Sequence, residues 1–138
     1  MLLSMKVKIE AARALTYEAA LALDLAKVGD RKQQERVEIL TPIVKACCTD
    51  MAVDIGSTAI QIHGGMGFVE ETGAAQYFRD ARILPIYEGT NGIQALDFVF
   101  RKLCRDKGES IRAYIQEISE SDFEELKLSL IHISEPTR

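Results

Sequence analysis

The sequence predicts an all-α fold, built as an antiparallel helical bundle. Apolar residues recur at the i, i+3, i+4 and i+7 positions over long stretches, which is the spacing of helices with one buried face. Glycine or proline stands where these stretches break. No stretch shows the apolar–polar alternation of a half-buried strand. We therefore expect helices joined by short connections.

The first helix is expected over residues 2–27. Its periodic positions include several alanines, which would leave a flat surface for close approach of a neighbouring helix. Gly29 and Asp30 should end it, because glycine readily takes the left-handed conformation that closes helices. Residues 31–38 are expected to form a solvated linker or the start of the next helix.

A second helix is expected to begin at Thr41 and Pro42. Threonine is a good capping residue, and proline suits the first helical turn. The apolar stripe of this helix continues to His63. Gly64 and Gly65 should stop it, because each glycine disfavours continuation by about 1 kcal/mol.

Three shorter helices are expected to follow: residues 72–82 with Thr72 as the cap, residues 92–104 with Thr90 or Asn91 as the cap, and residues 109–126. Pro85 interrupts the periodicity between the first two. Since proline and the residue before it disfavour helix, residues 83–89 should be extended or irregular.

The chain is expected to divide into three segments. Residues 1–107 form the helical domain, and residues 108–127 begin a truncated extra helical segment. Residues 128–138, LSLIHISEPTR, match residue for residue a translation of the mosaic-end adapter of transposase-based sequencing libraries. We interpret that segment as read-through, expect the natural protein to be cut at about Lys127, and exclude the segment from functional reasoning.

The composition narrows the possible classes of function. The 138 residues are 47% hydrophobic and 28% charged with a net charge of −4, which is ordinary for a soluble globular protein. Mild acidity gives no support for nucleic-acid or membrane binding as the main task. No apolar run approaches the roughly 18 residues of a membrane span, and the N-terminus lacks the features of a signal peptide. A bacterial cytoplasmic location is expected, or an organelle matrix if a targeting segment has been lost.

The three cysteines do not indicate a metal site or a disulfide. Cys47, Cys48 and Cys104 make an odd number and show no CxxC spacing. We expect them to be small buried apolar residues in a reducing compartment. No metal site is expected elsewhere in the chain.

QIHGGMG, at 61–67, is the first candidate functional motif. It is consistent with a helix end closed by a glycine cap. It is equally consistent with a loop whose uncovered backbone N–H groups let a phosphate or another anion approach. His63 taken alone is more often a structural histidine than a catalyst.

IYEGT, at 86–90, is the second motif. Glu88 is either an exposed loop glutamate or a carboxylate positioned by the scaffold. Apolar neighbours at Ile83, Leu84 and Ile86 would disfavour its charged form and make it a stronger base. Thr90 and Asn91 either cap the next helix or help that helix N-terminus hold an anionic ligand.

QIHGGMGFVEE followed by YFRDARILPIYEGTNGIQ resembles the C-terminal helical domain of the acyl-CoA dehydrogenases. The likeness extends from about Leu3 to Lys102, and the paired motif is specific. NGIQALDFVFRKL is similar to a longer subgroup that has an additional C-terminal region. That subgroup includes the 3-methylmercaptopropionyl-CoA dehydrogenases.

The resemblance implies a reaction and a set of site residues. Glu88 would be the catalytic base that removes the α-proton of an acyl-CoA thioester while a hydride leaves the β-carbon for FAD, giving a trans-2-enoyl-CoA. Gly89 would lie beside the thioester end of the substrate. The implied FAD contacts are Gln61, Ile62, His63, Gly64 and Gly65, commonly to the cofactor of a neighbouring subunit, and Thr90 and Gly92. Many relatives have a polar side chain at the position of Gly92, so that contact would use backbone only.

The resemblance also implies partners and missing parts. Acyl-CoA would be the substrate, electron-transferring flavoprotein the electron acceptor, and a homo-oligomer the assembled state. Relatives carry an N-terminal helical domain and a middle β-domain, so we expect this chain alone to be inactive. The alternatives are a non-catalytic helical oligomerisation module and a family member repurposed for another role.

Overall fold

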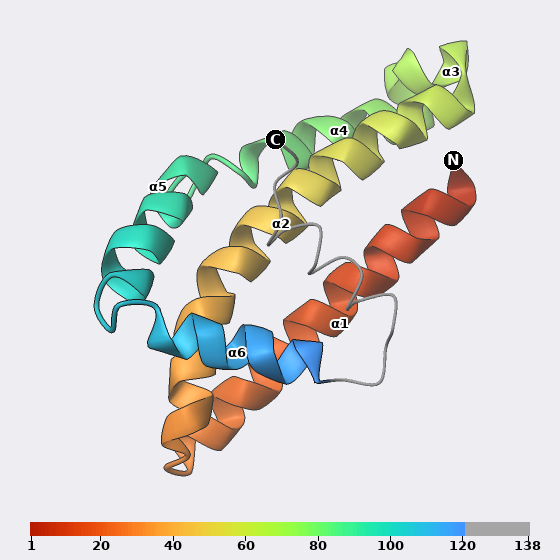
Figure 1. The fold of residues 1–138 in the computed structure, drawn as a ribbon. Helices are drawn as coiled ribbons and strands as arrows, with labels where there is room; N and C mark the ends of the chain where they lie inside the picture. The colour runs from red at the N-terminus through yellow and green to blue at the C-terminus, as the bar shows by residue number, and fades with distance from the viewer. Residues whose placement is uncertain (121–138) are drawn as a thin grey trace, which may run out of the picture.

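The structure is a computed structural model that describes residues 1–120, in which every regular element is helical (Figure 1). The elements in order are α1 (Leu2–Lys27), α2 (Arg31–His63), α3 (Gly65–Phe68), the 3₁₀ turn η1 (Glu70–Thr72), α4 (Ala74–Ile83), α5 (Asn91–Leu96), the π-helix η2 (Asp97–Leu103) and α6 (Glu109–Ser119). α1 and α2 run antiparallel, α4 returns along α2, and α6 crosses the α1–α2 pair (Figure 1). The expected all-α antiparallel bundle is confirmed. The adapter-like segment lies outside the described residues, as does the end of the helix expected over 109–126.

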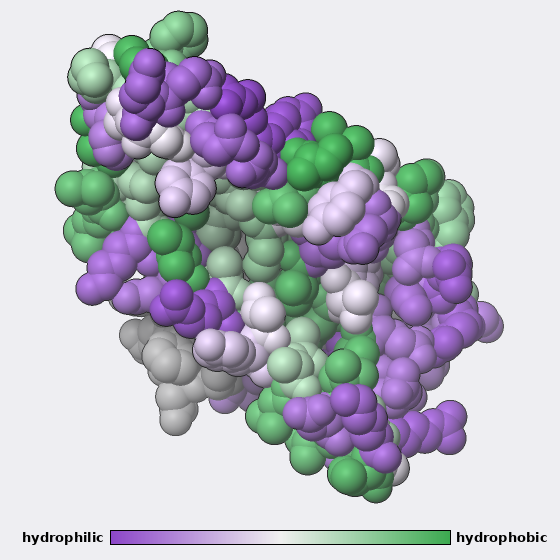
Figure 2. Space-filling model, turned by 180° about the vertical axis from the view of Figure 1, so that it is seen from behind, coloured by the Kyte–Doolittle hydropathy of each residue, from purple (hydrophilic) through white to green (hydrophobic). Residues whose placement is uncertain are grey.

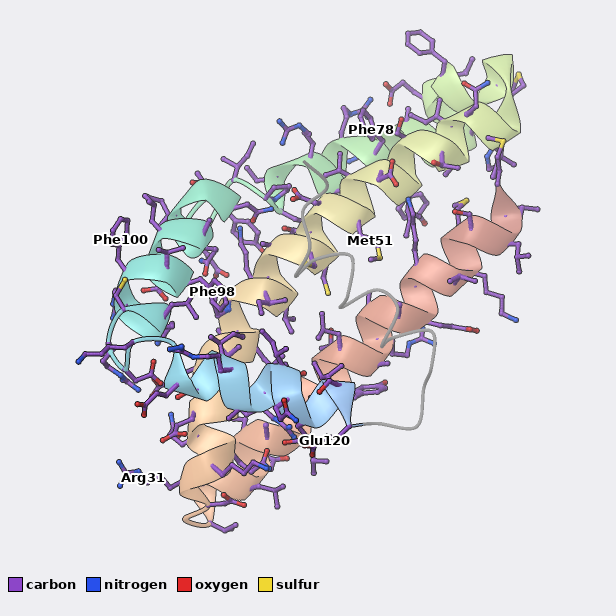
Figure 3. All side chains as sticks on the ribbon, in the orientation of Figure 1. Arg31, Met51, Phe78, Phe98, Phe100 and Glu120 are labelled. Atoms are coloured by element: carbon purple, nitrogen blue, oxygen red, sulfur yellow. The ribbon has the colours of Figure 1, made fainter. Side chains whose placement is uncertain are left out.

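The pairing of α1 with α2 holds most of the small core. Ala22 of α1 is 2% exposed, and Ile39 and Leu40 of α2 are 4% and 1% exposed. Met51 lies on the side of α2 that faces α1 (Figure 3). Because alanine has a short side chain, α1 approaches α2 closely, as its alanine content predicted.

The second helix begins ten residues earlier than Thr41 suggested, so the expected start at Thr41 and Pro42 is wrong. The Asp30 side chain accepts a hydrogen bond from the Gln33 backbone N–H (3.1 Å) and caps the helix there. Thr41 instead donates its hydroxyl hydrogen bond back to the Val37 carbonyl. Pro42 lies inside the helix, which costs about 3 kcal/mol in isolation, and it is buried. Tertiary packing therefore overrides the local signal.

The cap expected for the third helix, Thr72, does not cap it, so this prediction is also wrong. Gly73 takes a left-handed conformation (φ +82°) and is itself the N-cap of α4, while the Thr72 hydroxyl donates to the Met66 carbonyl. Only a residue that tolerates positive φ can make this sharp entry into α4. α4 then packs against α2 at Gly56, where an added Cβ would lie 3.1 Å from the Cα of Phe78. Glycine thus sets the α2–α4 distance.

α6 is attached to the α1–α2 pair through a group of charged and aromatic side chains. Glu117 pairs with Arg36 and with Lys32 (3.0 Å). The Arg36 guanidinium lies 4.9 Å from the centre of the Tyr114 ring. Burial, together with the hydrogen bond that Tyr114 donates to Glu18 (2.9 Å), raises the pKa of Tyr114 to about 12. α6, the described helix of the expected extra segment, therefore packs against the α1–α2 pair.

Much apolar surface stays exposed around this core. Apolar and hydrophilic side chains alternate over the back of the molecule, and Phe100 points away from the bundle (Figures 2 and 3). The expectation of buried cysteines is wrong: Cys47 and Cys104 are exposed, and Cys48, which faces Thr16 of α1, is only half-buried. Neighbouring helical residues point about 100° apart, so only one of an adjacent pair can face α1. Among the described residues, no helix has the length and apolar character needed to cross a membrane.

Candidate functional site

The loop between α4 and α5 carries Glu88. It is irregular, as predicted, and its ends are tied together where the Asn91 backbone N–H donates to the Pro85 carbonyl (3.1 Å). Glu88 has φ +53° and Gly89 has φ +86°. A positive φ is ordinary for glycine but costs a side-chain-bearing residue about 1 kcal/mol or more. The fold therefore holds Glu88 in a conformation that its own backbone disfavours.

Contacts from α5 help to hold that conformation. Thr90 is the N-cap of α5, and its hydroxyl oxygen accepts from the Ile93 N–H (3.3 Å), which confirms one of the two caps expected there. The Gln94 side chain donates to the Glu88 carbonyl (3.4 Å). The first turn of α5 thus contacts the loop and stabilises its conformation.

Asn91 fixes the same loop to α2. Its side-chain oxygen accepts from Lys45 Nζ (2.9 Å), and its amide nitrogen donates to Asp50 Oδ1 (2.8 Å). The amide nitrogen also lies within hydrogen-bond distance of Thr49 Oγ1 (3.1 Å) and the Ala46 carbonyl (3.3 Å). The sequence had suggested that Asn91 caps the helix or helps its N-terminus hold an anionic ligand, and not that it anchors the loop to α2. Its partners lie more than 40 positions earlier in the chain, so no local signal indicated them.

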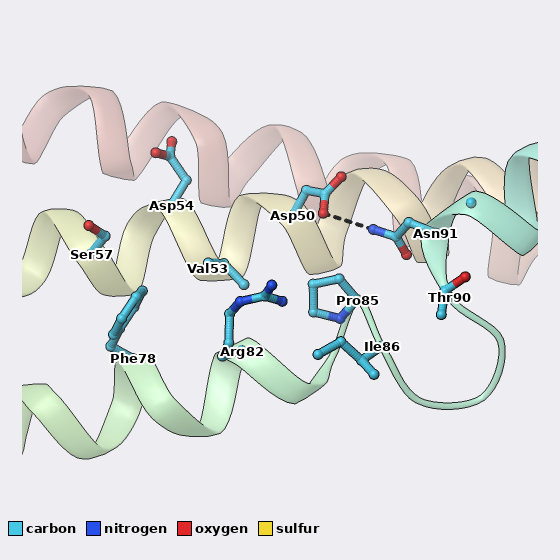
Figure 4. A pocket seen from close by; sticks show the side chains of 11 residues that line it. Asp50, Val53, Asp54, Ser57, Phe78, Arg82, Pro85, Ile86, Thr90 and Asn91 are labelled. Atoms are coloured by element: carbon cyan, nitrogen blue, oxygen red, sulfur yellow. Dashed lines mark hydrogen bonds between the residues drawn. The ribbon is translucent and has the colours of Figure 1, made fainter.

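An open cleft of about 670 Å³ lies beside this anchor, between α2, α4 and the start of α5 (Figure 4). Thr90 and Gly92, both predicted site residues, line it. Arg82 and Phe78 of α4 line it as well, although neither was predicted as a site residue. Glu88 is not among the lining residues.

The Glu88 side chain is exposed to solvent. The apolar enclosure expected from its neighbours is not formed within residues 1–120, since Ile83 is 50% exposed and Ile86 is 47% exposed. The carboxylate is therefore positioned by its backbone, and its side chain is free to meet another molecule.

The other predicted site residues lie at the far end of α2. Its last turn contains Gln61 and Ile62, and it ends at His63, as expected. His63 Nδ1 lies 2.9 Å from the Ala59 carbonyl. Since a carbonyl only accepts hydrogen bonds, Nδ1 carries the hydrogen, and Nε2 is the acceptor in the neutral ring. Gly64 follows with φ +61°.

The glycines at this end differ from one another. An added Cβ at Gly64 or Gly65 would meet nothing within 4 Å, so the backbone there is open. Gly67 is the opposite case: it is buried, and an added Cβ would lie 2.9 Å from His63 Cβ and closer still to the Ile60 carbonyl. Gly64 and Gly67 also use their N–H groups inside the chain, donating to Gln61 and Gly64 respectively. The helix cap is thus confirmed, whereas the uncovered N–H groups of the other alternative are not present at Gly64 or Gly67; what remains is open space beside the backbone of Gly64 and Gly65.

The two groups of predicted site residues do not meet in one chain. Asn91 contacts α2 at Thr49 and Asp50, whereas Gln61 lies three helical turns further along. At 1.5 Å per residue this separates the two groups by roughly 15–20 Å. A dinucleotide bound to both groups at once would have to span that distance, so residues 1–120 offer two partial contact regions and no single enclosed cradle.

Comparisons with known proteins match both the motifs and the fold. A family model described as acyl-CoA dehydrogenase, C-terminal domain, matches residues 1–103. The chain is 48% identical over 128 residues to a 3-methylmercaptopropionyl-CoA dehydrogenase of Ruegeria pomeroyi, covering 90% of this chain and 22% of the relative. It is 40% identical to a butyryl-CoA dehydrogenase of Syntrophomonas wolfei, covering 87% of this chain and 20% of the relative.

A solved structure titled "Bd2924 apo-form" shares the fold with a TM-score of 0.80 and 27% identity, covering 96% of this chain and 26% of that one. The chain spans about a fifth of the length of the curated relatives it matches. The resemblance noted in the sequence, including that to the subgroup with 3-methylmercaptopropionyl-CoA dehydrogenases, is confirmed. The chain belongs to the acyl-CoA dehydrogenase family, in which it corresponds to the C-terminal helical domain.

Proposed function

We propose that this chain is part of a flavin-dependent acyl-CoA dehydrogenase that converts an acyl-CoA thioester to a trans-2-enoyl-CoA, with Glu88 as the α-proton base. The observation that carries the proposal is the conformation of Glu88. A non-glycine residue at positive φ, in a loop tied to α2 through Asn91 and to α5 through Gln94, indicates that its position has a purpose beyond closing a turn.

Glu88 suits the role of base in this setting. Its exposed carboxylate is free to receive a proton from a substrate that lies against the loop. Gly89 has no side chain and takes φ +86°, so a thioester can pass close to the backbone beside the base. The remaining domains of the enzyme would supply the apolar cover that Ile83 and Ile86 alone do not provide, and excluding water there would strengthen the base.

FAD, when bound, would accept the hydride that leaves the β-carbon as the α-proton is removed. We propose that Thr90 and the Gly92 backbone contact one FAD molecule, while Gln61, Ile62, His63, Gly64 and Gly65 contact the FAD of a neighbouring subunit. The open backbone at Gly64 and Gly65 supports close approach of a phosphate-bearing group.

Oligomerisation also fits the exposed apolar side chains around the glycine end. Met66 is 62% exposed and Phe68 is 82% exposed, and Ile62 is 36% exposed. Such a cluster is more typical of an interface than of a solvated surface. A homo-oligomer would cover it, acyl-CoA would be the substrate, and electron-transferring flavoprotein would be the acceptor that reoxidises the enzyme.

The direct test is Glu88→Gln in the complete enzyme. Turnover with acyl-CoA should fall about 10³-fold, because general-base catalysis contributes on that scale, while bound flavin is retained. Glu109→Gln is the matched control, since Glu109 is also exposed but lies in the first turn of α6. Near-normal turnover of Glu88→Gln would reject the base assignment and leave the non-catalytic helical module as the alternative.

A second test concerns the chain by itself. With only partial contacts to the cofactor, the 138-residue chain should neither bind FAD stoichiometrically nor oxidise acyl-CoA. Absorbance titration of the purified chain with FAD measures this. Stoichiometric flavin binding would contradict the division of the site between domains and subunits.

A further inference from the structure

We propose that Asn91 is a positioning residue, which holds the Glu88 loop in its reactive place by joining a cation and an anion of α2 through its side-chain amide. This inference rests on the proposed function of Glu88. Asn91 does not touch the reacting atoms; it acts through the loop that it anchors.

The polarity of the anchor is matched to an amide. Lys45 offers a hydrogen-bond donor to the Asn91 side-chain oxygen, and Asp50 offers an acceptor to its nitrogen. The Ala46 carbonyl is a further acceptor on the nitrogen side. Thr49 donates its own hydroxyl to the Lys45 carbonyl (2.7 Å), so its oxygen also accepts from the amide nitrogen. A carboxylate has no donor for these acceptors and a hydroxyl has only one, whereas the amide brings an acceptor for Lys45 and two N–H hydrogens that the three acceptors share.

The anchor connects directly to the strained part of the loop. The Asn91 backbone N–H also donates to the Pro85 carbonyl. One residue therefore joins the two ends of the loop and also attaches the loop to α2. Glu88 and Gly89 lie between these two points with positive φ. Releasing the attachment would let both residues relax toward ordinary conformations, which would move the Glu88 carboxylate away from its substrate.

The informative substitution is Asn91→Asp, which keeps the shape of the side chain. The oxygen facing Lys45 remains, but an oxygen replaces the nitrogen that lies 2.8 Å from the Asp50 carboxylate. Two carboxylates at that distance repel each other, and the loop should shift. Adding Asp50→Asn should restore one hydrogen bond with the donor and acceptor exchanged.

In the complete enzyme, Asn91→Asp should lower kcat about 100-fold, because a displacement of about 1 Å in a reacting group costs that much. KM for acyl-CoA should change less than about threefold, and flavin content should not change. Deuteration of the substrate at the α-carbon should slow the variant by a larger factor than it slows the wild type, since proton removal then limits turnover. The double variant Asn91→Asp with Asp50→Asn should recover at least about tenfold of the lost kcat.

Two controls make the outcomes distinct. Gln34→Glu places a carboxylate beside Glu38 on the same helix, where the Gln34 amide donates to Glu38 (3.4 Å), and should leave kcat unchanged. Asn91→Ala removes the anchor without adding charge and serves if the aspartate variant fails to fold.

Glu88→Gln is measured in parallel to separate the two hypotheses. Normal kcat in both Asn91 variants with an inactive Glu88→Gln would overturn the positioning role while leaving the base assignment intact. Failure of Asp50→Asn to recover any activity would also count against the proposed pairing. An active Glu88→Gln would instead overturn the proposed function itself.

Discussion

The Glu88 loop and the glycine end of α2 are both candidate contact regions, yet they are built in opposite ways. The loop is tied to α2 by the Asn91 amide, closed at Pro85 and supported by Gln94. The glycine end has open backbone at Gly64 and Gly65 and apolar side chains that nothing in the described chain covers. The described residues thus fix the backbone of the first region by themselves, although they leave Glu88 uncovered, whereas the backbone and side chains of the second region are both open to another surface.

The largest expected effect tests whether the glycine end is open throughout. Gly67→Ala should lower the free energy of unfolding by about 3 kcal/mol, because the added methyl group would overlap the Ile60 carbonyl and press on His63. Gly65→Ala, only two positions away, should change it by no more than about 0.5 kcal/mol. Urea unfolding of both variants measures the contrast. Equal effects in the two variants would contradict the close packing of Gly67 against Ile60 and His63.

An intermediate effect tests whether the glycine end serves a partner. Gln61→Ala should weaken flavin retention in the complete enzyme about tenfold, as expected for the loss of one good hydrogen bond. Its exposure predicts little change in unfolding free energy. Flavin fluorescence after dilution gives the affinity, and Gln34→Ala on the same helix is the control. Unchanged flavin affinity would remove Gln61 from the cofactor contacts.

The smallest expected effect concerns the attachment of α6 to α2 through charged side chains. We compare it with the attachment of the Glu88 loop through the Asn91 amide. Hydrogen bonds from Arg36 and Lys32 hold the pKa of the Glu117 carboxyl below its usual range. A lowered folded-state pKa stabilises the protein above the unfolded pKa, and this contribution is lost as pH falls through the folded value. Wild type should therefore be more stable than Glu117→Gln at neutral pH. The difference should be less than about 1 kcal/mol, because the Glu117 side chain is half exposed to solvent.

Thermal unfolding of both proteins from pH 7 down to pH 3 measures that difference. It should shrink steadily below the usual glutamate range near pH 4.5. A difference that stays constant through the acid range would show that Glu117 contributes packing and not charge.

The sequence predicted well what depends on local chemistry. The bounds of α1, the end of α2 at Gly64, the irregular segment after Ile83 and the Thr90 cap all follow from helix periodicity and capping rules. It failed where distant packing decides the outcome. Pro42 looked like a helix start because its burial inside α2, which accompanies its place in the helix interior, cannot be read from the neighbouring residues.

The candidate site divides in the same way. Glu88 and the glycine motif were found from residue type and spacing, with the family resemblance to join them. The anchoring role of Asn91 was missed, because an asparagine before a helix is indistinguishable from a cap until Lys45 and Asp50 are seen beside it. Fixed tertiary contacts of a single polar side chain leave no periodic trace in a sequence.

The π-helix η2 (Asp97–Leu103) lies between α5 and the turn that leads into α6. A π turn holds about one residue more than an α turn, so deleting one residue here should restore α geometry. Each residue of an α-helix advances the chain by about 100° and 1.5 Å, so the deletion would change where the turn before α6 begins. That shift would strain the contacts that Tyr114 and Glu117 make with Glu18 and Arg36. The extra residue in η2 thus acts as a spacer that lets α6 reach the α1–α2 pair.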